Sequence, residues 1–145
     1  MKSNRDFQLT LWRSILPVVV LLLSALACSG TGLAYEHDLV KDYAIWAGDL
    51  KAQAAVVQKI PDSSSASTVV GPMVFAYGWN EAFIIAKQHP NPFGGAGIDT
   101  GVTHWFIVEV ASEEVHGPLT ETEYLELREQ LAIPHALDFV KTIEP

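Results

Sequence analysis

Short segments of alternating apolar and polar residues, separated by glycine, proline and polar turns, constrain the fold of this chain more than any other feature. Successive side chains of a β-strand point to opposite faces of a sheet, so such alternation predicts half-buried strands. The predicted strands cover residues 43–47, 53–60, 73–79, 82–88 and 104–110, with a short pairing at 115–116 and a polar loop at 61–67. The segment 53–60 is also compatible with a helical turn. The pattern therefore predicts an antiparallel meander of about four or five strands.

Large side chains occupy alternate positions in the third of these segments. They are Met73, Phe75, Tyr77 and Trp79, which the alternation places on one face of the sheet. Aromatic residues on strands could line a carbohydrate or peptide groove, but they more often belong to a core. The same two interpretations apply to Trp46, Phe83, Trp105 and Phe106.

A helix is predicted after the last strand. Thr120 and Glu123 have the spacing of a capping box, in which each side chain hydrogen-bonds the backbone amide of the other residue. Tyr124, Leu127 and Leu131 then follow at helical spacing and form one apolar stripe. Pro134 ends the helix, and an extended arm or strand is expected over residues 137–142. The expected fold is an α+β domain with one C-terminal helix packed on the meander.

The N-terminus has the organisation of a secretory signal peptide. Basic residues precede an apolar segment of 13 residues from Ile15 to Ala27, which is shorter than the roughly 20 residues of a membrane-spanning helix. The segment ends in Ala-Leu-Ala followed by Cys28, which resembles a bacterial lipobox, where the cysteine thiol receives a diacylglycerol. The alternative is ordinary cleavage after Ala27 or Ala34, which would release an exported protein with one free thiol.

These features predict three parts of the chain and a location. Residues 1–27 are expected to be a lipoprotein-type signal peptide, residues 28–37 a flexible tether and residues 38–145 a single domain. Acyl chains on Cys28 would hold the exported protein on a membrane. In a Gram-negative cell, Ser29 favours the periplasmic face of the outer membrane. In other cells the expected place is the outer face of the plasma membrane.

Charge and cysteine content exclude several classes of protein. After removal of residues 1–27, six basic residues remain against 16 acidic residues, and such a surface repels the phosphates of nucleic acid. Cys28 is the only cysteine, which rules out an internal disulfide framework and a cysteine-rich zinc site.

Local motifs for catalysis or cofactor binding are absent from the sequence. The five histidines occur in separate segments without the close spacing of metal ligands, so neither a metal site nor a cofactor is predicted. The chain has no G-x-S-x-G motif, and no catalytic residue is predicted. The glycines at 94–97 precede a strand, whereas a phosphate-binding loop precedes a helix.

The long connection at residues 89–101 is the predicted binding segment. It contains two prolines and four glycines, and connections of this length in compact domains are usually functional. The residues expected to contribute to binding are Phe93, Gly94 and Gly95 in the connection and His104 at the start of the next strand.

Three segments of the second half resemble a family of short, functionally uncharacterised bacterial envelope proteins, many of which are lipoproteins. The segments are WNEAFIIAK at 79–87, HWFIVE at 104–109 and VHGPLT at 115–120, followed by Tyr124 and Arg128. The resemblance implies a strand, strand, helix order and a cell-envelope setting. It implies no catalytic residues.

Two functions are compatible with these observations. The first is a lipid-anchored, non-enzymatic binding module whose partners are the membrane, through the anchor, and a protein or cell-wall component, but not nucleic acid. The alternative is a small envelope hydrolase or ligand-binding enzyme with a site near His104, His116 and Glu109. A pocket that joins these three side chains would support the alternative.

Overall fold

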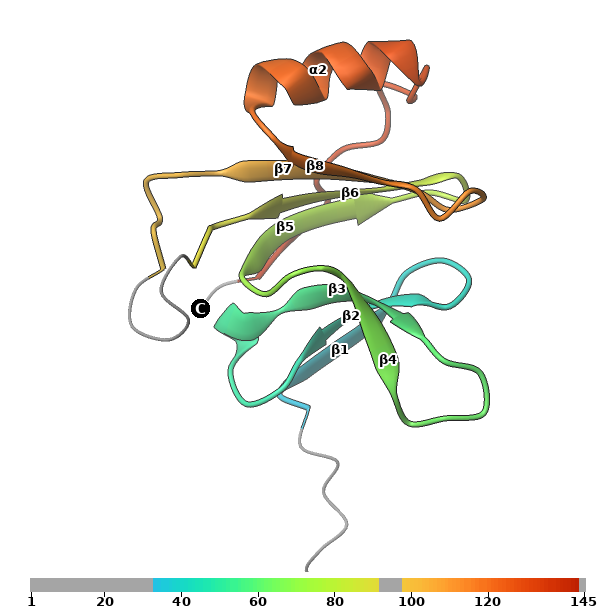
Figure 1. The fold of residues 1–145 in the computed structure, drawn as a ribbon, viewed down its shortest axis with the longest axis vertical. Coiled ribbons are helices and arrows are strands. Elements are labelled where there is room, and N and C mark those ends of the chain that lie inside the picture. The colour runs from blue at the N-terminus through green and yellow to red at the C-terminus, as the bar shows by residue number, and fades with distance from the viewer. Residues whose placement is uncertain (1–32, 92–97, 144–145) are drawn as a thin grey trace, which may run out of the picture. The chain divides into compact units, whose positions relative to one another are not determined.

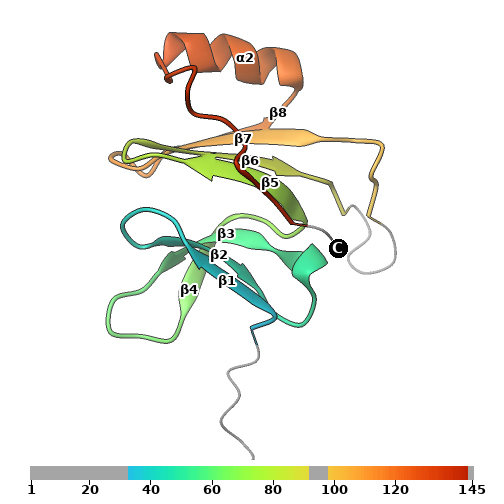
Figure 2. The same ribbon diagram turned by 180° about the vertical axis from the view of Figure 1, so that it is seen from behind.

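Two antiparallel sheets and one helix make up the computed structural model, which describes residues 33–91 and 98–143 (Figures 1 and 2). The first sheet has the order β1-β2-β3-β4, with strands β1 (Tyr35–Asp38), β2 (Tyr43–Ala47), β3 (Ala55–Lys59) and β4 (Ala66–Val70). The second sheet has the order β8-β7-β6-β5-β9, with strands β5 (Val74–Trp79), β6 (Phe83–Gln88), β7 (His104–Glu109), β8 (Val115–Leu119) and β9 (Lys141–Thr142). A 3-10 turn, η1 (Lys51–Gln53), and a helix, α2 (Glu121–Gln130), complete the elements. The fold class predicted from sequence, α+β with antiparallel strands and one helix, is confirmed.

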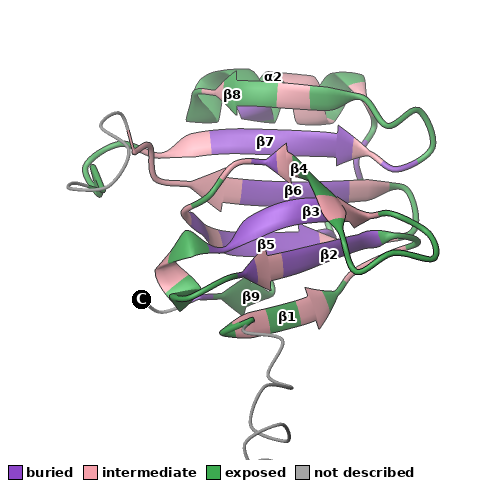
Figure 3. Ribbon diagram, turned by 60° about the horizontal axis from the view of Figure 1, so that its bottom comes forward, coloured by how far each residue is buried: buried purple, intermediate pink, exposed green. Residues whose placement is uncertain are grey.

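The main core lies between the two sheets, which face each other in Figure 1. Buried residues are concentrated on the central strands of both sheets (Figure 3). The fully buried side chains of this core include Tyr43, Ile45, Val56, Val70, Val74, Tyr77, Ile84, Val108 and Val110. Hydrogen bonds also connect the sheets: among them, the Val74 amide donates to the Ala54 carbonyl at 2.9 Å, and the hydroxyls of Tyr35 and Tyr77 lie 2.8 Å apart.

A second core lies between the other face of the second sheet and α2. The capping box begins the helix as predicted, because the Thr120 amide donates to the Glu123 carboxylate at 2.8 Å and the Glu123 amide donates to the Thr120 hydroxyl at 3.3 Å. Tyr124 is buried on the sheet with its ring centroid 4.7 Å from that of Trp105. Leu127 and Leu131 pack against the same cluster. The apolar stripe predicted from sequence is therefore the face by which α2 binds the sheet.

The chain beyond α2 returns to the open edge of the second sheet. The Arg128 guanidinium holds this C-terminal arm by donating to the carbonyls of Pro134, at 2.8 Å, and of Leu137. The arm ends in β9, which pairs with β5, and the Ile143 amide donates to the Phe75 carbonyl at 2.7 Å. An extended arm over 137–142 was expected, and only its last two residues form a strand. Within the described ranges, no helix is both long enough and apolar enough to cross a membrane.

Both edge strands of the first sheet differ from the sequence prediction. β1 begins three residues before Asp38, where we expected the folded domain to start, and pairs Tyr35 with Ala47. β4 begins at Ala66, inside the predicted polar loop. β1 has four residues of which two are acidic, and β4 begins with Ala66 and Ser67, so neither has the composition typical of a strand. β3, in contrast, confirms the strand interpretation of the segment 53–60.

The face predicted for the large residues of β5 is correct for only part of the strand. Tyr77 and Trp79 lie opposite Ala86 and Ile84 and pack in the core between the sheets. The β5–β6 register shifts between Val74 and Ala76, which makes the intervening Phe75 an irregular position. A one-residue bulge moves the side chains that precede it to the other face. Phe75 therefore lies outside the core, where the strict alternation had placed it inside.

Candidate functional site

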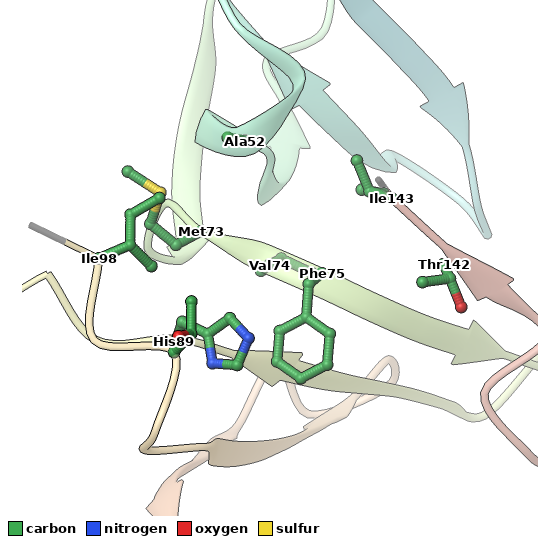
Figure 4. Close-up of a pocket in the computed structure, with 9 residues that line it drawn as sticks. Ala52, Met73, Val74, Phe75, His89, Ile98, Thr142 and Ile143 are labelled. Carbon is green, nitrogen blue, oxygen red and sulfur yellow. The ribbon is translucent and has the colours of Figure 1, made fainter. Parts of the chain in front are cut away.

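A small apolar pocket of about 260 Å³ lies at one end of the space where both sheets, η1 and the long connection meet (Figure 4). Its lining residues come from four separate parts of the chain. They are Ala52 of η1, Met73, Val74 and Phe75 around the start of β5, His89, Ile98 and Thr100 of the connection, and Thr142 and Ile143 at the C-terminal arm.

The bulge in β5 produces one wall of the pocket. Phe75 stacks on the imidazole of His89, with ring centroids 4.1 Å apart and planes inclined by 13°. The Nδ1 atom of His89 lies 2.9 Å from the Val102 carbonyl, which can only accept, so Nδ1 carries the proton. This hydrogen bond and the stacking fix the ring at the pocket wall, where Figure 4 shows it beside Phe75.

The pocket is mainly apolar. Its lining is mostly aliphatic and aromatic, with His89, Thr100 and Thr142 as the polar side chains. None of the lining residues is a carboxylate or a cysteine that could pair with the histidine. Ligand pockets commonly occupy about 300–1,000 Å³. A cavity just below that range suits one apolar side chain or a short alkyl chain.

The predicted binding residues relate to this pocket in different ways. Phe93, Gly94 and Gly95 lie outside the described residues, whereas the flanking His89, Ile98 and Thr100 line the pocket. His104 pairs with Gln88 at the same end of the sheet but is not a lining residue.

Sequence reasoning missed the other walls of the pocket, which are formed by Ala52, Met73, Thr142 and Ile143. These positions are distant in sequence. Pairing of β9 with β5 brings Thr142 and Ile143 to the start of β5, and Ala52 comes from η1, between β2 and β3. The stacking of Phe75 on His89 could not be predicted from sequence either, because it depends on the bulge in β5.

The residues of the alternative, enzymatic site do not converge. The His116 Nε2 atom lies 2.8 Å from the Glu109 Oε1 atom, so these two residues are in contact. His104, however, is the first residue of β7 and Glu109 is the last. At a rise of about 3.3 Å per residue, the two lie roughly 16 Å apart. The third member of the cluster is Glu114 instead, whose Oε1 atom is 3.9 Å from the His116 Nδ1 atom.

Except for Phe75 at the pocket, the aromatic residues of the strands in the second sheet pack in cores rather than in an open groove. Tyr77, Trp105 and Phe106 are buried in the two main clusters. On the outer face of the second sheet, the ammonium of Lys87 lies 4.0 Å from the ring centroid of Trp105 and 4.4 Å from that of Phe139. The chain's own lysine therefore occupies the cation site that these rings create.

Comparison with known proteins gives a family and no function. A family model described as a protein of unknown function matches residues 40–143, which include every element from β2 to β9. No curated protein matches the chain, and no solved structure does.

Proposed function

This chain belongs to the DUF3997 family, a family of unknown function, and from that starting point we propose that it is a lipid-anchored binding module of the bacterial cell envelope. The apolar pocket, lined in part by His89, Ile98 and Thr100, is the observation that carries the proposal. The module binds a protein or a cell-wall component by taking up an apolar group in this pocket.

Position and composition of the pocket support this role. Loops held by a rigid scaffold are where binding residues concentrate, and here the two ends of the long connection contribute pocket walls. Burial of one apolar side chain contributes about 1.5–3 kcal/mol. The pocket thus provides an anchor point, and exposed residues around its opening supply the remaining contacts of a larger interface.

The segment before the domain supports the membrane anchor. Ile15 to Ala27 followed by Cys28 fits lipoprotein processing, and two or three acyl chains bind a bilayer essentially permanently. Such a protein sits on the periplasmic face of the outer membrane in a Gram-negative cell, and on the outer face of the plasma membrane otherwise.

Site-specific crosslinking in cells tests the binding role. A photo-crosslinking amino acid replaces Ile98, which is 39% exposed at the pocket, or Leu125, which is 53% exposed on α2. We expect an adduct of defined mass from position 98 and none of that mass from position 125. The additional substitution Ala52→Phe fills the pocket from η1 and should remove the adduct. An adduct that survives Ala52→Phe, or that forms equally from position 125, would place binding elsewhere.

A further inference from the structure

The hairpin between β7 and β8 places two carboxylates directly opposite each other. The Glu109 amide donates to the Glu114 carbonyl at 2.9 Å, and the Glu113 amide donates to the Glu109 carbonyl at 2.9 Å. The adjacent pairs are Val108 with Val115 and Ile107 with His116. His116 follows Glu114 by two positions, so its side chain leaves the sheet on the same face as that of Glu114.

The three side chains meet above this face. One potential ligand atom from each of Glu109, Glu114 and His116 lies within 4.8 Å of the other two. The His116 and Glu109 side chains are 19% and 27% exposed, so the backbone and neighbouring residues limit their movement. Glu114 is 63% exposed and can rotate.

The His116 imidazole donates to the Glu109 carboxylate at 2.8 Å, which offsets only part of the repulsion between the two facing carboxylates. Carboxylates that face each other across two strands repel, which destabilises a hairpin. Glu113 adds a third carboxylate to the same turn, and its Oε1 atom accepts a hydrogen bond from Gln58 at 3.1 Å. The ammonium of Lys41 approaches the turn, but the hydrogen bond that it donates, at 3.1 Å, goes to the backbone carbonyl of Val110 and not to a carboxylate. A cation shared by Glu109, Glu114 and His116 would relieve the repulsion.

We propose that Glu109, Glu114 and His116 bind a divalent transition-metal ion of the zinc type. One imidazole and two carboxylates are ligands that zinc accepts, whereas magnesium and calcium prefer oxygen ligands alone. Tetrahedral zinc with bonds of about 2.0–2.2 Å keeps its ligand atoms about 3.3 Å apart. His116 and Glu109 are already in contact, so rotation of the exposed Glu114 side chain is the movement that would bring the third ligand atom to that separation. The fourth position stays open to water or to a ligand from a partner.

This metal site is independent of the apolar pocket. The β7–β8 hairpin lies at the opposite end of the second sheet from the 89–101 connection (Figure 1). Failure of one proposal therefore leaves the other intact.

Zinc titration of the chelator-treated full-length chain in detergent tests the site. Calorimetry compares the wild type with Glu109→Gln, Glu114→Gln and His116→Gln. The matched control is His135→Gln. The His135 Nε2 atom lies 4.0 Å from the Glu129 Oε1 atom, but among the described residues His135 belongs to no group of three potential metal ligands. Cys28 is present in all variants and contributes equally.

We expect the wild type and His135→Gln to bind zinc alike. His116→Gln and Glu109→Gln should weaken binding by at least about tenfold, since even residues that only orient a ligand are worth that much. Zinc should also raise the melting temperature of the wild type and the control but not of His116→Gln, and magnesium should not compete. Equal affinity of His116→Gln and His135→Gln, or no saturable zinc binding by the wild type, would overturn the proposal.

Discussion

Gly78 lies where the C-terminal arm crosses β5. A Cβ atom at this position would lie 2.0 Å from the Asp138 carbonyl oxygen and 3.5 Å from the Ile85 Cγ1 atom. The first of these neighbours is backbone, so it cannot rotate away. The absence of a side chain at Gly78 is what allows the arm to lie on the sheet.

Gly78→Ala should destabilise the domain by about 1–3 kcal/mol or more, because the added methyl group forces the arm away from β5. Urea unfolding followed by tryptophan fluorescence measures the change. Gly48→Ala is the control, since nothing lies within 4 Å of a Cβ atom there. The free energy of unfolding of Gly48→Ala should differ from that of the wild type by no more than about 0.5 kcal/mol. Equal effects of the two substitutions would contradict the packing argument.

Tyr77 carries a hydroxyl in the core between the sheets. Burial and the hydrogen bond with the Tyr35 hydroxyl raise the pKa of Tyr77 well above its ordinary value of 10.0. Burial likewise raises the pKa of Tyr124 and of Tyr43. All three phenols are therefore held in the neutral, protonated form in the folded state.

Stability should fall as the pH rises above about 10. In that range the unfolded chain releases phenolic protons that the folded chain retains, so each further rise in pH favours unfolding. Below the pKa of the unfolded chain the full stability is present. Urea midpoints between pH 8 and pH 11 measure the decline, and Tyr77→Phe should make it shallower. Parallel declines for the two proteins would show that Tyr77 is not responsible.

Helix α2 depends on its first turn. The backbone amide of Thr120, and then its hydroxyl, lower the pKa of the Glu123 carboxyl, as expected for a carboxylate that accepts both hydrogen bonds. Glu121 and Glu123 also place negative charge at the helix N-terminus, where the backbone dipole favours it. The buried Tyr124 then begins the face that packs on the sheet.

Thr120→Ala should cost about 0.5–2 kcal/mol, the usual loss for an N-cap residue. The urea midpoint of the domain reports the change, because α2 covers the second core. Thr122→Ala serves as the control, since Thr122 is exposed in the same turn and caps nothing. An unchanged midpoint for Thr120→Ala would mean that the cap contributes no stability.

At the scale of the whole molecule, the proposed anchor would determine where the domain works. Cys28 follows the apolar segment at the position where lipoprotein processing would create a new N-terminus. The strands described by the structure begin at Tyr35, which leaves only a short connection between the thiol and the first sheet. A lipid on Cys28 would keep the domain close to the bilayer.

The wild type should fractionate with membranes, and its intact mass should include acyl groups on Cys28. Cys28→Ala should remove that mass and leave the protein unprocessed or in the soluble fraction. Intact-protein mass spectrometry and membrane fractionation of cells provide the two measurements. A soluble wild type with an unmodified thiol would reject the anchor.

Local sequence determined the elements that carry a strong periodic or capping signal. The strands β5, β6 and β7 pack against apolar neighbours on both faces of the second sheet, so their apolar residues stand out in the sequence. Helix α2 is specified by the capping box and the stripe from Tyr124 to Leu131. The capping box joins residues that are close together in the chain, and the strands and the helix face are specified by the spacing of their apolar residues, so both signals can be read from local sequence.

Tertiary structure decided the edges, the bulge and which residues complete each candidate site. β1 and β4 are strands because β2 and β3 offer them hydrogen bonds, and their own composition is not typical of strands. The bulge at Phe75 reverses the face that alternation assigns, which opens the pocket wall. Sequence spacing predicted no metal ligands, yet hairpin register brings Glu109, Glu114 and His116 together. Such contacts depend on pairing register and sheet packing. Their energies come from interactions between segments that are distant in sequence, so the sequence of a single segment shows no pattern that predicts them.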